Sequence, residues 1–132
     1  MKDFVINVSW PPKQLSPNGR YHWAQVARCS KKARSEARLM MLAERQRRNL
    51  LVIDPKKITK VGISYLFVPP DRRARDDDNL IRAMKPYRDG IAEALGVDDK
   101  IFRTQESDFG KPMRPAYVVI HVQVHEEGDD GV

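Results

Sequence analysis

The chain has 132 residues, of which 24 are lysine or arginine, 18 are aspartate or glutamate and one is cysteine. This length suits one domain with a modest core, and a single cysteine excludes an intrachain disulfide and argues against a cysteine-based zinc site. No apolar stretch approaches the roughly 20 residues that span a bilayer, and the N-terminus lacks the hydrophobic segment of a signal peptide, so we expect a cytoplasmic protein without a membrane segment.

The charge is unevenly distributed along the chain. The net charge is +6, but residues 126–132 hold four of the acids, so the first 125 residues carry 24 basic and 14 acidic side chains, a net +10. A basic body favours nucleic acid or another polyanion as partner, although an ordinary solvated surface has the same composition. We therefore expect a folded domain over residues 1–125 and a disordered acidic tail over residues 126–132.

The first half of the chain predicts a strand followed by a long helix. A strand over residues 4–10 is indicated by apolar residues at every second position, Phe4, Ile6, Val8 and Trp10. Prolines end it, and residues 12–20 are typical of a loop. Residues 23–49 lack proline and glycine and are rich in helix formers, which predicts a helix with a basic outer side and a break near Ser30.

The second half predicts a further strand, a helix and two more strands. Residues 61–67 alternate, and apolar residues at helical spacing over 78–95 predict a helix that ends at Gly96 and kinks at Pro86. Residues 101–109 have a weaker strand pattern and residues 117–124 a clear one. The order β-α-β-α-β-β predicts an α+β fold in which two main helices pack on a mixed sheet.

Residues 71–79 form the most unusual stretch, Asp71-Arg72-Arg73-Ala74-Arg75-Asp76-Asp77-Asp78-Asn79. Three adjacent carboxylates repel one another, and either a bound divalent cation or the capping of a helix would offset that repulsion. Both readings stay open. The neighbouring arginines suit an anionic ligand, so a metal together with a polyanion points to phosphodiester chemistry.

The spacing of the acidic and basic residues predicts which of their side chains share one face. In an extended segment Asp76 and Asp78 would point to one side and Asp77 away. Because helical residues are about 100° apart, one polar face of the predicted helix holds Asp78, Arg82, Lys85 and Asp89. Mg²⁺ prefers oxygen ligands and activates water, and a nearby lysine can hold a phosphate. The pair Asp98-Asp99 offers a third carboxylate, although it also fits a simple polar turn.

Several motifs together resemble the RusA-type Holliday junction resolvases of phages and prophages. They are Val8-Ser9-Trp10-Pro11-Pro12 with Asn18-Gly19-Arg20, the arginine-rich D-x-D-N-L block ending at Leu80, and Asp89-Gly90-Ile91 with Asp98-Asp99-Lys100. The resemblance implies a small homodimeric Mg²⁺-dependent endonuclease, with Mn²⁺ as a substitute metal, that cuts four-way DNA junctions in recombination and repair. It implies that Asp76, Asp78 and Asp99 are the catalytic metal ligands.

The resemblance leaves the catalytic cation open. Arg82 stands where the family has its essential lysine, and extra residues including Pro86 lie between Asn79 and Asp89. We assign the role to Lys85, one turn later on the same face, because a compact ammonium and a planar guanidinium are not equivalent. The residues assigned to DNA binding are Asn18, Arg20, Arg72, Arg73, Arg75 and Arg82, although Asn18-Gly19 also suits an ordinary turn.

Other readings compete with an endonuclease. The arginine at position 82 and the extra residues also suit a non-catalytic DNA-binding module of the same fold, and the acidic tail could serve a protein-interaction module. His22, His121 and His125 lack metal-ligand spacing. Trp10 and Trp23 are expected to anchor the core or a loop, with stacking on exposed DNA bases as the alternative.

Overall fold

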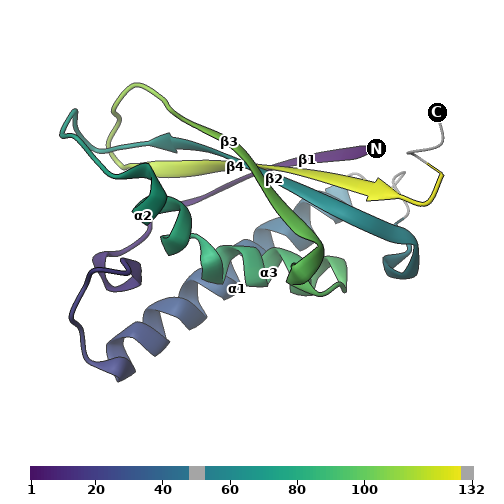
Figure 1. Cartoon of the computed structure of the whole chain (residues 1–132), viewed down its shortest axis with the longest axis horizontal. Coiled ribbons are helices and arrows are strands. Elements are labelled where there is room, and N and C mark those ends of the chain that lie inside the picture. Colours follow the sequence, from purple (N-terminus) through teal and green to yellow (C-terminus); the bar gives the residue numbers. More distant parts are fainter. Residues whose placement is uncertain (48–52, 129–132) are drawn as a thin grey trace.

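A four-stranded mixed sheet carries the fold, in the order β1-β4-β2-β3. The computed structural model describes residues 1–47 and 53–128. The strands are β1 (Lys2–Ser9), β2 (Ile58–Val68), β3 (Phe102–Phe109) and β4 (Tyr117–Glu126). The helices α1 (Trp23–Arg47) and α3 (Lys85–Leu95) lie on one side of the sheet (Figure 1). The α+β fold predicted from the sequence is confirmed.

The strand directions follow from the connections between them. β4 pairs antiparallel with both β1 and β2, whereas β3 pairs parallel with β2. Parallel strands need a crossover connection, and here the short helix α2 (Asp77–Ala83) and α3 supply it. Because β2 and β3 run parallel, the loop that leads from β2 to α2 lies beside the end of β3, whereas the turn after α3 lies at the start of β3.

The core forms between the sheet and the helices. Alternate residues of β1, β2 and β4 face the helices and are fully or nearly fully buried, namely Phe4, Ile6, Val8, Val61, Ile63, Tyr65, Phe67, Val118, Ile120, Val122 and Val124. The helices contribute Ala33, Ala37 and Met41 from α1 and Tyr87, Ile91 and Leu95 from α3. The opposite face of the sheet is more open, since Val5 and Leu66 there are exposed.

The two long helices approach each other at a glycine. A Cβ atom placed on Gly90 would lie 2.2 Å from the backbone oxygen of Arg34. Real Cβ atoms do not come that close to a carbonyl oxygen, so the contact between α1 and α3 requires glycine at this position.

The structure corrects several of the predicted boundaries. The single kinked helix predicted over 78–95 is two helices joined at Met84, because Pro86 lacks an N–H and falls in the first turn of a new helix, where none is needed. The predicted break near Ser30 is wrong, since α1 is continuous from Trp23 to Arg47; residues 48 and 49 of that prediction lie outside the described residues. Gly96 ends α3 in the left-handed conformation, φ 76°, as predicted.

The end of β4 also differs from the prediction. β4 extends to Glu126, which pairs with Ile58, so the sheet includes the first residue of the predicted acidic tail. Residues 129–132 of that tail lie outside the described residues. Among the described residues, no helix has the length and apolar character needed to cross a bilayer.

Candidate metal centre

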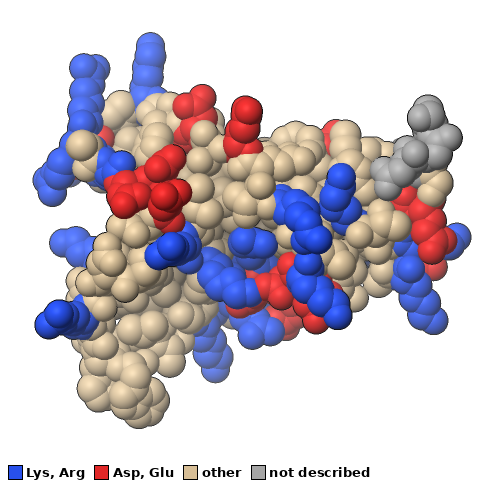
Figure 2. Space-filling model, in the orientation of Figure 1, with Lys and Arg blue, Asp and Glu red and all other residues tan. Residues whose placement is uncertain are grey.

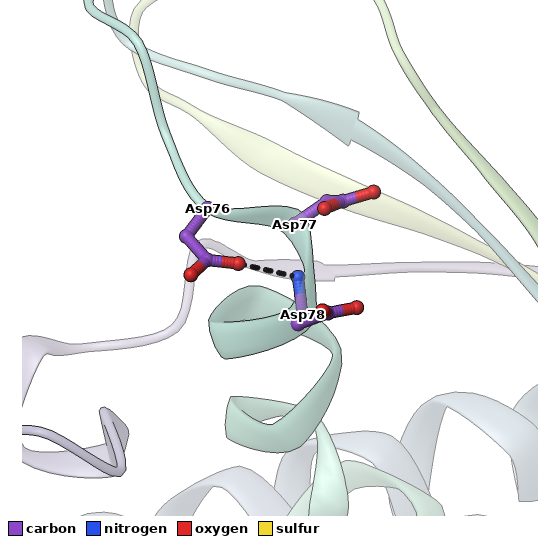
Figure 3. Close-up of side chains that lie close together, drawn as sticks. All are labelled: Asp76, Asp77 and Asp78. Carbon is purple, nitrogen blue, oxygen red and sulfur yellow. Dashed lines mark hydrogen bonds between the residues drawn. The ribbon is translucent and has the colours of Figure 1, made fainter.

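The acidic block forms the start of α2. Asp76 is the N-cap residue, and its Oδ1 accepts hydrogen bonds from the backbone N–H of Asp78 at 3.0 Å and of Asn79 at 3.4 Å (Figure 3). Asp77 and Asp78 occupy the first turn, where negative charge is favoured by the helix dipole. The capping interpretation of the block is therefore confirmed for Asp76.

The same three residues bring their carboxylates together. Asp76, Asp77 and Asp78 each offer one oxygen, and these oxygens lie within 4.8 Å of one another on an exposed surface. In octahedral Mg²⁺ coordination neighbouring ligand oxygens are about 3 Å apart and opposite ones about 4.2 Å, so these side chains would have to rotate closer together to share one ion. The donor set is therefore of the hard, anionic kind that a divalent cation prefers.

Asp77 belongs to this group, whereas the sequence pattern predicts that it points away. The prediction assumes an extended chain through Asp78, but the helix begins at Asp77. In Figure 3 the carboxylates of Asp77 and Asp78 point to the same side of the helix, and Asp76 lies across the first turn. The geometry thus offers a third carboxylate from within the block itself.

The structure places Asp99 with Lys85. The ammonium of Lys85 donates a hydrogen bond to Asp99 Oδ2 and another, of 2.9 Å, to Asp89 Oδ1. Within the described part of the chain, Asp76, Asp77 and Asp78 are the one cluster of at least three possible metal-binding side chains, and Asp99 is not in it. The predicted set of Asp76, Asp78 and Asp99 is thus divided in this structure: Asp76 and Asp78 lie at the start of α2, whereas Asp99 lies in the short helical turn before β3.

These ion pairs shift the protonation of both partners. The hydrogen bond from Lys85 lowers the pKa of the Asp99 carboxyl below its usual value, and the positive charge of Arg88 acts in the same direction. The hydrogen bonds to Asp99 and then to Asp89 raise the pKa of Lys85. Asp99 is therefore ionised and Lys85 is positively charged across the neutral range.

The arginines of the block have different surroundings. Arg75 donates from Nη1 to the backbone oxygens of Asp71 and Arg73, at 3.0 and 2.7 Å, and from Nη2 to the Asp71 carboxylate at 2.7 Å. Its guanidinium also lies 5.6 Å from the centre of the Trp10 ring. Arg75 thus holds the loop in shape, while the exposed Arg72 and Arg73 extend from it.

A hollow of about 480 Å³ lies between this loop and the end of β3, and its lining includes the arginines together with Phe109, Gly110 and Lys111. Lys111 was not among the residues singled out from the sequence, because no pattern links it to the block 36 residues earlier. Arg82 is exposed in the last turn of α2, and its side chain has no hydrogen bond or ion pair to any described residue. It is therefore free to contact an anion.

Arg88 is a second residue that the sequence did not single out. Its guanidinium lies 5.8 Å from the centre of the Phe102 ring, and its Nη1 donates to Thr104 Oγ1 at 3.1 Å. Among the described residues, its buried Nε has no hydrogen-bond partner, and neither does the buried hydroxyl of Tyr65. Arg88 follows Lys85 by three residues on α3, and that spacing was the one available signal.

The remaining candidate residues are distributed over the surface. Asn18 and Arg20 lie exposed in the loop before α1. Trp10 packs edge-on against Phe67, with ring centres 6.1 Å apart, as expected of an anchor, whereas Trp23 is 76% exposed and does not anchor the core. His121 Nε2 lies 3.2 Å from a carboxylate oxygen of Asp3, which is an ordinary surface contact.

No protein-family model matches the chain. Over 97 residues, 74% of its length, the chain is 43% identical to a protein of Xylella fastidiosa that is described as uncharacterized. The matched part is 61% of that bacterial protein, so the chain spans less than two thirds of its relative.

Proposed function

We propose that the chain is a Mg²⁺-dependent DNA endonuclease that resolves four-way junctions by paired hydrolysis of phosphodiester bonds. The observation that carries this proposal is the grouping of Asp76, Asp77 and Asp78 within 4.8 Å at the start of α2, directly after an arginine-rich loop. A cluster of hard anionic ligands beside cations is what metal-assisted attack on a polyanion requires. The resemblance of this block to the RusA-type motif supports the same reaction.

Each acidic residue has a role in this proposal. Asp76 and Asp78 hold Mg²⁺ or Mn²⁺, with Asp77 near enough to join them, and the bound metal lowers the pKa of a coordinated water and neutralises charge on the phosphate. Asp99, which the resemblance gives as the third ligand, is ionised and paired with Lys85, so it would have to leave that pair to join the metal. The lysine and a cation thus compete for the same carboxylate.

Lys85 is the residue that would bind the phosphate group being cut. When Asp99 turns to the metal, the ammonium is left near Asp89 and can donate its free N–H groups to a phosphate oxygen. Arg82 is the alternative, since its guanidinium has no partner among the described residues. The exposed Arg72 and Arg73 would bind the backbone on either side, and charge would dominate the affinity.

A junction resolvase needs two matched active sites. We propose a two-fold homodimer that presents one acidic cluster to each of two opposing strands, the commonest symmetry of small oligomers. The expected setting is the cytoplasm of a bacterial host, with a phage or prophage origin, in DNA recombination and repair.

The test is cleavage of a synthetic four-way junction by purified protein over a series of Mg²⁺ and Mn²⁺ concentrations. Asp78→Asn should abolish cleavage while leaving binding intact or stronger, because it removes a metal ligand and one negative charge near the DNA. Glu127→Gln, which removes an exposed charge at the end of β4, is the matched control and should cut normally. Junctions left intact at every metal concentration would refute the proposal.

A non-catalytic junction-binding or DNA-binding module is the second candidate. It is favoured by the structural roles that the acids already have: Asp76 caps α2 and Asp99 pairs with Lys85. Such a module would bind junctions equally with and without metal. It would also tolerate Asp76→Asn without change, because asparagine caps a helix as well as aspartate does.

A further inference from the structure

Three consecutive rings stand exposed where the loop enters α1. Tyr21 is 40% exposed and Trp23 76%, and His22 between them is also exposed. Large aromatic side chains contribute to a fold chiefly by burial, yet Trp23 is the most exposed large hydrophobic residue in the described part of the chain. The cluster of Tyr21, His22 and Trp23, called here the aromatic platform, therefore does little for the core.

The aromatic platform is held in place by its own backbone. The Nδ1 atom of His22 accepts a hydrogen bond from the N–H of Ala24 at 3.1 Å, which fixes the imidazole at the start of the helix. The imidazole and the Trp23 ring have centres 5.4 Å apart and planes 32° apart. Tyr21 lies against Gly19, where a Cβ atom would come within 2.6 Å of its ring. Rings fixed in this way lose little freedom when a ligand stacks on them.

The surroundings of the platform are positively charged. From residue 4 to residue 35 the chain has no aspartate or glutamate, and its cations there are Lys13, Arg20, Arg28, Lys31, Lys32 and Arg34. Figure 2 shows the same contrast: the protrusion at lower left, where Figure 1 places the start of α1, carries basic side chains on its flanks and none that are acidic. Exposed aromatic faces among cations suit a polyanion with flat bases.

The platform also lies on a path to the proposed active site. Trp23 and Ala27 are four residues apart, so they share one face of α1. Ala27 lines a hollow of about 390 Å³ between α1 and α3, together with Lys31, Arg34, Lys85 and Asp89. One face of α1 thus extends from the aromatic platform to the hollow that Lys85 lines.

We propose that Trp23, supported by His22, stacks on an unpaired base of DNA whose backbone lies along the hollow that contains Lys85. This inference rests on the proposed function, because it takes branched DNA as the substrate, and the branch point interrupts base stacking and makes it easier for a base to leave its pair. The ligand recognised is the flat face of a nucleobase, while Lys31 and Arg34 contact the phosphates beside it.

The test measures binding in EDTA, so that cleavage does not interfere. A Trp10→Phe variant leaves Trp23 as the sole tryptophan, and its fluorescence is followed during titration with an oligothymidylate and with an abasic strand of equal length and charge. Quenching by the strand with bases and none by the abasic strand is the expected result. Equal quenching of the Trp23 fluorescence by both strands, or no quenching by either, would contradict the proposed stacking.

A second measurement needs no change at Trp10. Trp23→Ala should weaken binding of the oligothymidylate about 5- to 100-fold, the range that the loss of one base–aromatic stack implies, and leave binding of the abasic strand unchanged. Trp23→Tyr should keep most of the affinity. Leu39→Ala, which removes another exposed apolar side chain of α1, should have no effect.

The outcomes separate this inference from the proposed function. A protein that cuts junctions but binds both strands through charge alone refutes the stacking and leaves the endonuclease intact. If the protein binds strands with bases more tightly than abasic strands but cuts no branched DNA, the proposed endonuclease activity is refuted and the stacking by Trp23 is supported. Binding of a protein partner that is lost in Trp23→Ala, without any effect on DNA, would also contradict the inference.

Discussion

Lys85 on α3 contacts the carboxylate of Asp99 across the turn that precedes β3. Its second partner is Asp89, one turn further along the same helix and 2.9 Å away. One ammonium therefore neutralises a carboxylate that the proposed mechanism needs as a metal ligand. If Asp99 is a metal ligand, as proposed, its pairing with Lys85 competes with metal binding at this carboxylate.

The identity of the catalytic cation is decided by two substitutions. Lys85→Ala should reduce junction cleavage about 10²-fold or more, the usual effect of removing one donor that stabilises developing charge. Arg82→Ala should change mainly DNA affinity and its salt dependence, because an exposed guanidinium acts on the phosphate backbone. Single-turnover cleavage rates at saturating protein separate the two effects, and a larger loss of rate in Arg82→Ala would assign the role to Arg82.

The Lys85–Asp99 pair predicts a specific pH dependence of stability. Because the folded pKa of Asp99 lies below its ordinary value of 3.8, its stabilisation is present above that value and is lost as the pH falls through the lower folded value. Because the pKa of Lys85 is raised above 10.5, its stabilisation is present below 10.5 and is lost only at higher pH. The contribution should therefore be constant between these limits.

The measurement is urea unfolding of the protein and of Asp99→Asn at pH 7 and pH 3. At pH 7 the variant should be less stable by under about 1 kcal/mol, since the side chain of Lys85 is 57% exposed and the ion pair is screened by solvent. At pH 3 the difference should shrink toward zero. A difference that grows on acidification would contradict the pairing.

Asp76 has a structural role and a proposed chemical role that substitution can separate. Asp76→Ala should lower the free energy of unfolding by about 1 kcal/mol, because the N-cap of α2 is lost. Asp76→Asn should keep the cap and the stability, yet abolish cleavage if the carboxylate binds metal. Thermal unfolding and junction cleavage, measured on both variants, give the comparison; a stable and fully active Asp76→Asn would remove Asp76 from the metal site.

The contact between α1 and α3 depends on Gly90. Gly90→Ala should destabilise the protein by about 1–3 kcal/mol, the usual cost of overpacking, because the new Cβ meets the backbone oxygen of Arg34. Gly110→Ala is the control, since a Cβ there would meet side-chain atoms and no backbone, Val68 at 3.3 Å and Leu66 at 3.8 Å. Chemical unfolding of both variants measures the difference, and equal stability would show that the helices can separate at no cost.

The elements with strong periodicity were predictable from the sequence. The alternation in residues 61–67 and 117–124 identified β2 and β4, and the helical spacing that ends at Gly96 identified α3. The division of the second helix at Met84 was not predictable, because Pro86 is compatible either with a kink or with the first turn of a new helix.

The candidate site was predictable in composition and less so in arrangement. Asp76 and Asp78 could be selected because three adjacent carboxylates need an explanation. The pairing of Lys85 with Asp99 could not, since it joins residues 14 positions apart through a turn whose shape no periodicity specifies. Arg88 escaped notice for the same reason, because its partners Phe102 and Thr104 lie on β3.

Cleavage of a four-way junction by the protein and by Asp78→Asn, with and without Mg²⁺, is the most direct measurement. We expect paired nicks on opposing strands that require Mg²⁺ and the Asp78 carboxylate, with junction binding retained in the variant. Cleavage that persists in Asp78→Asn, or junctions that stay intact when the protein binds them in Mg²⁺, would contradict it.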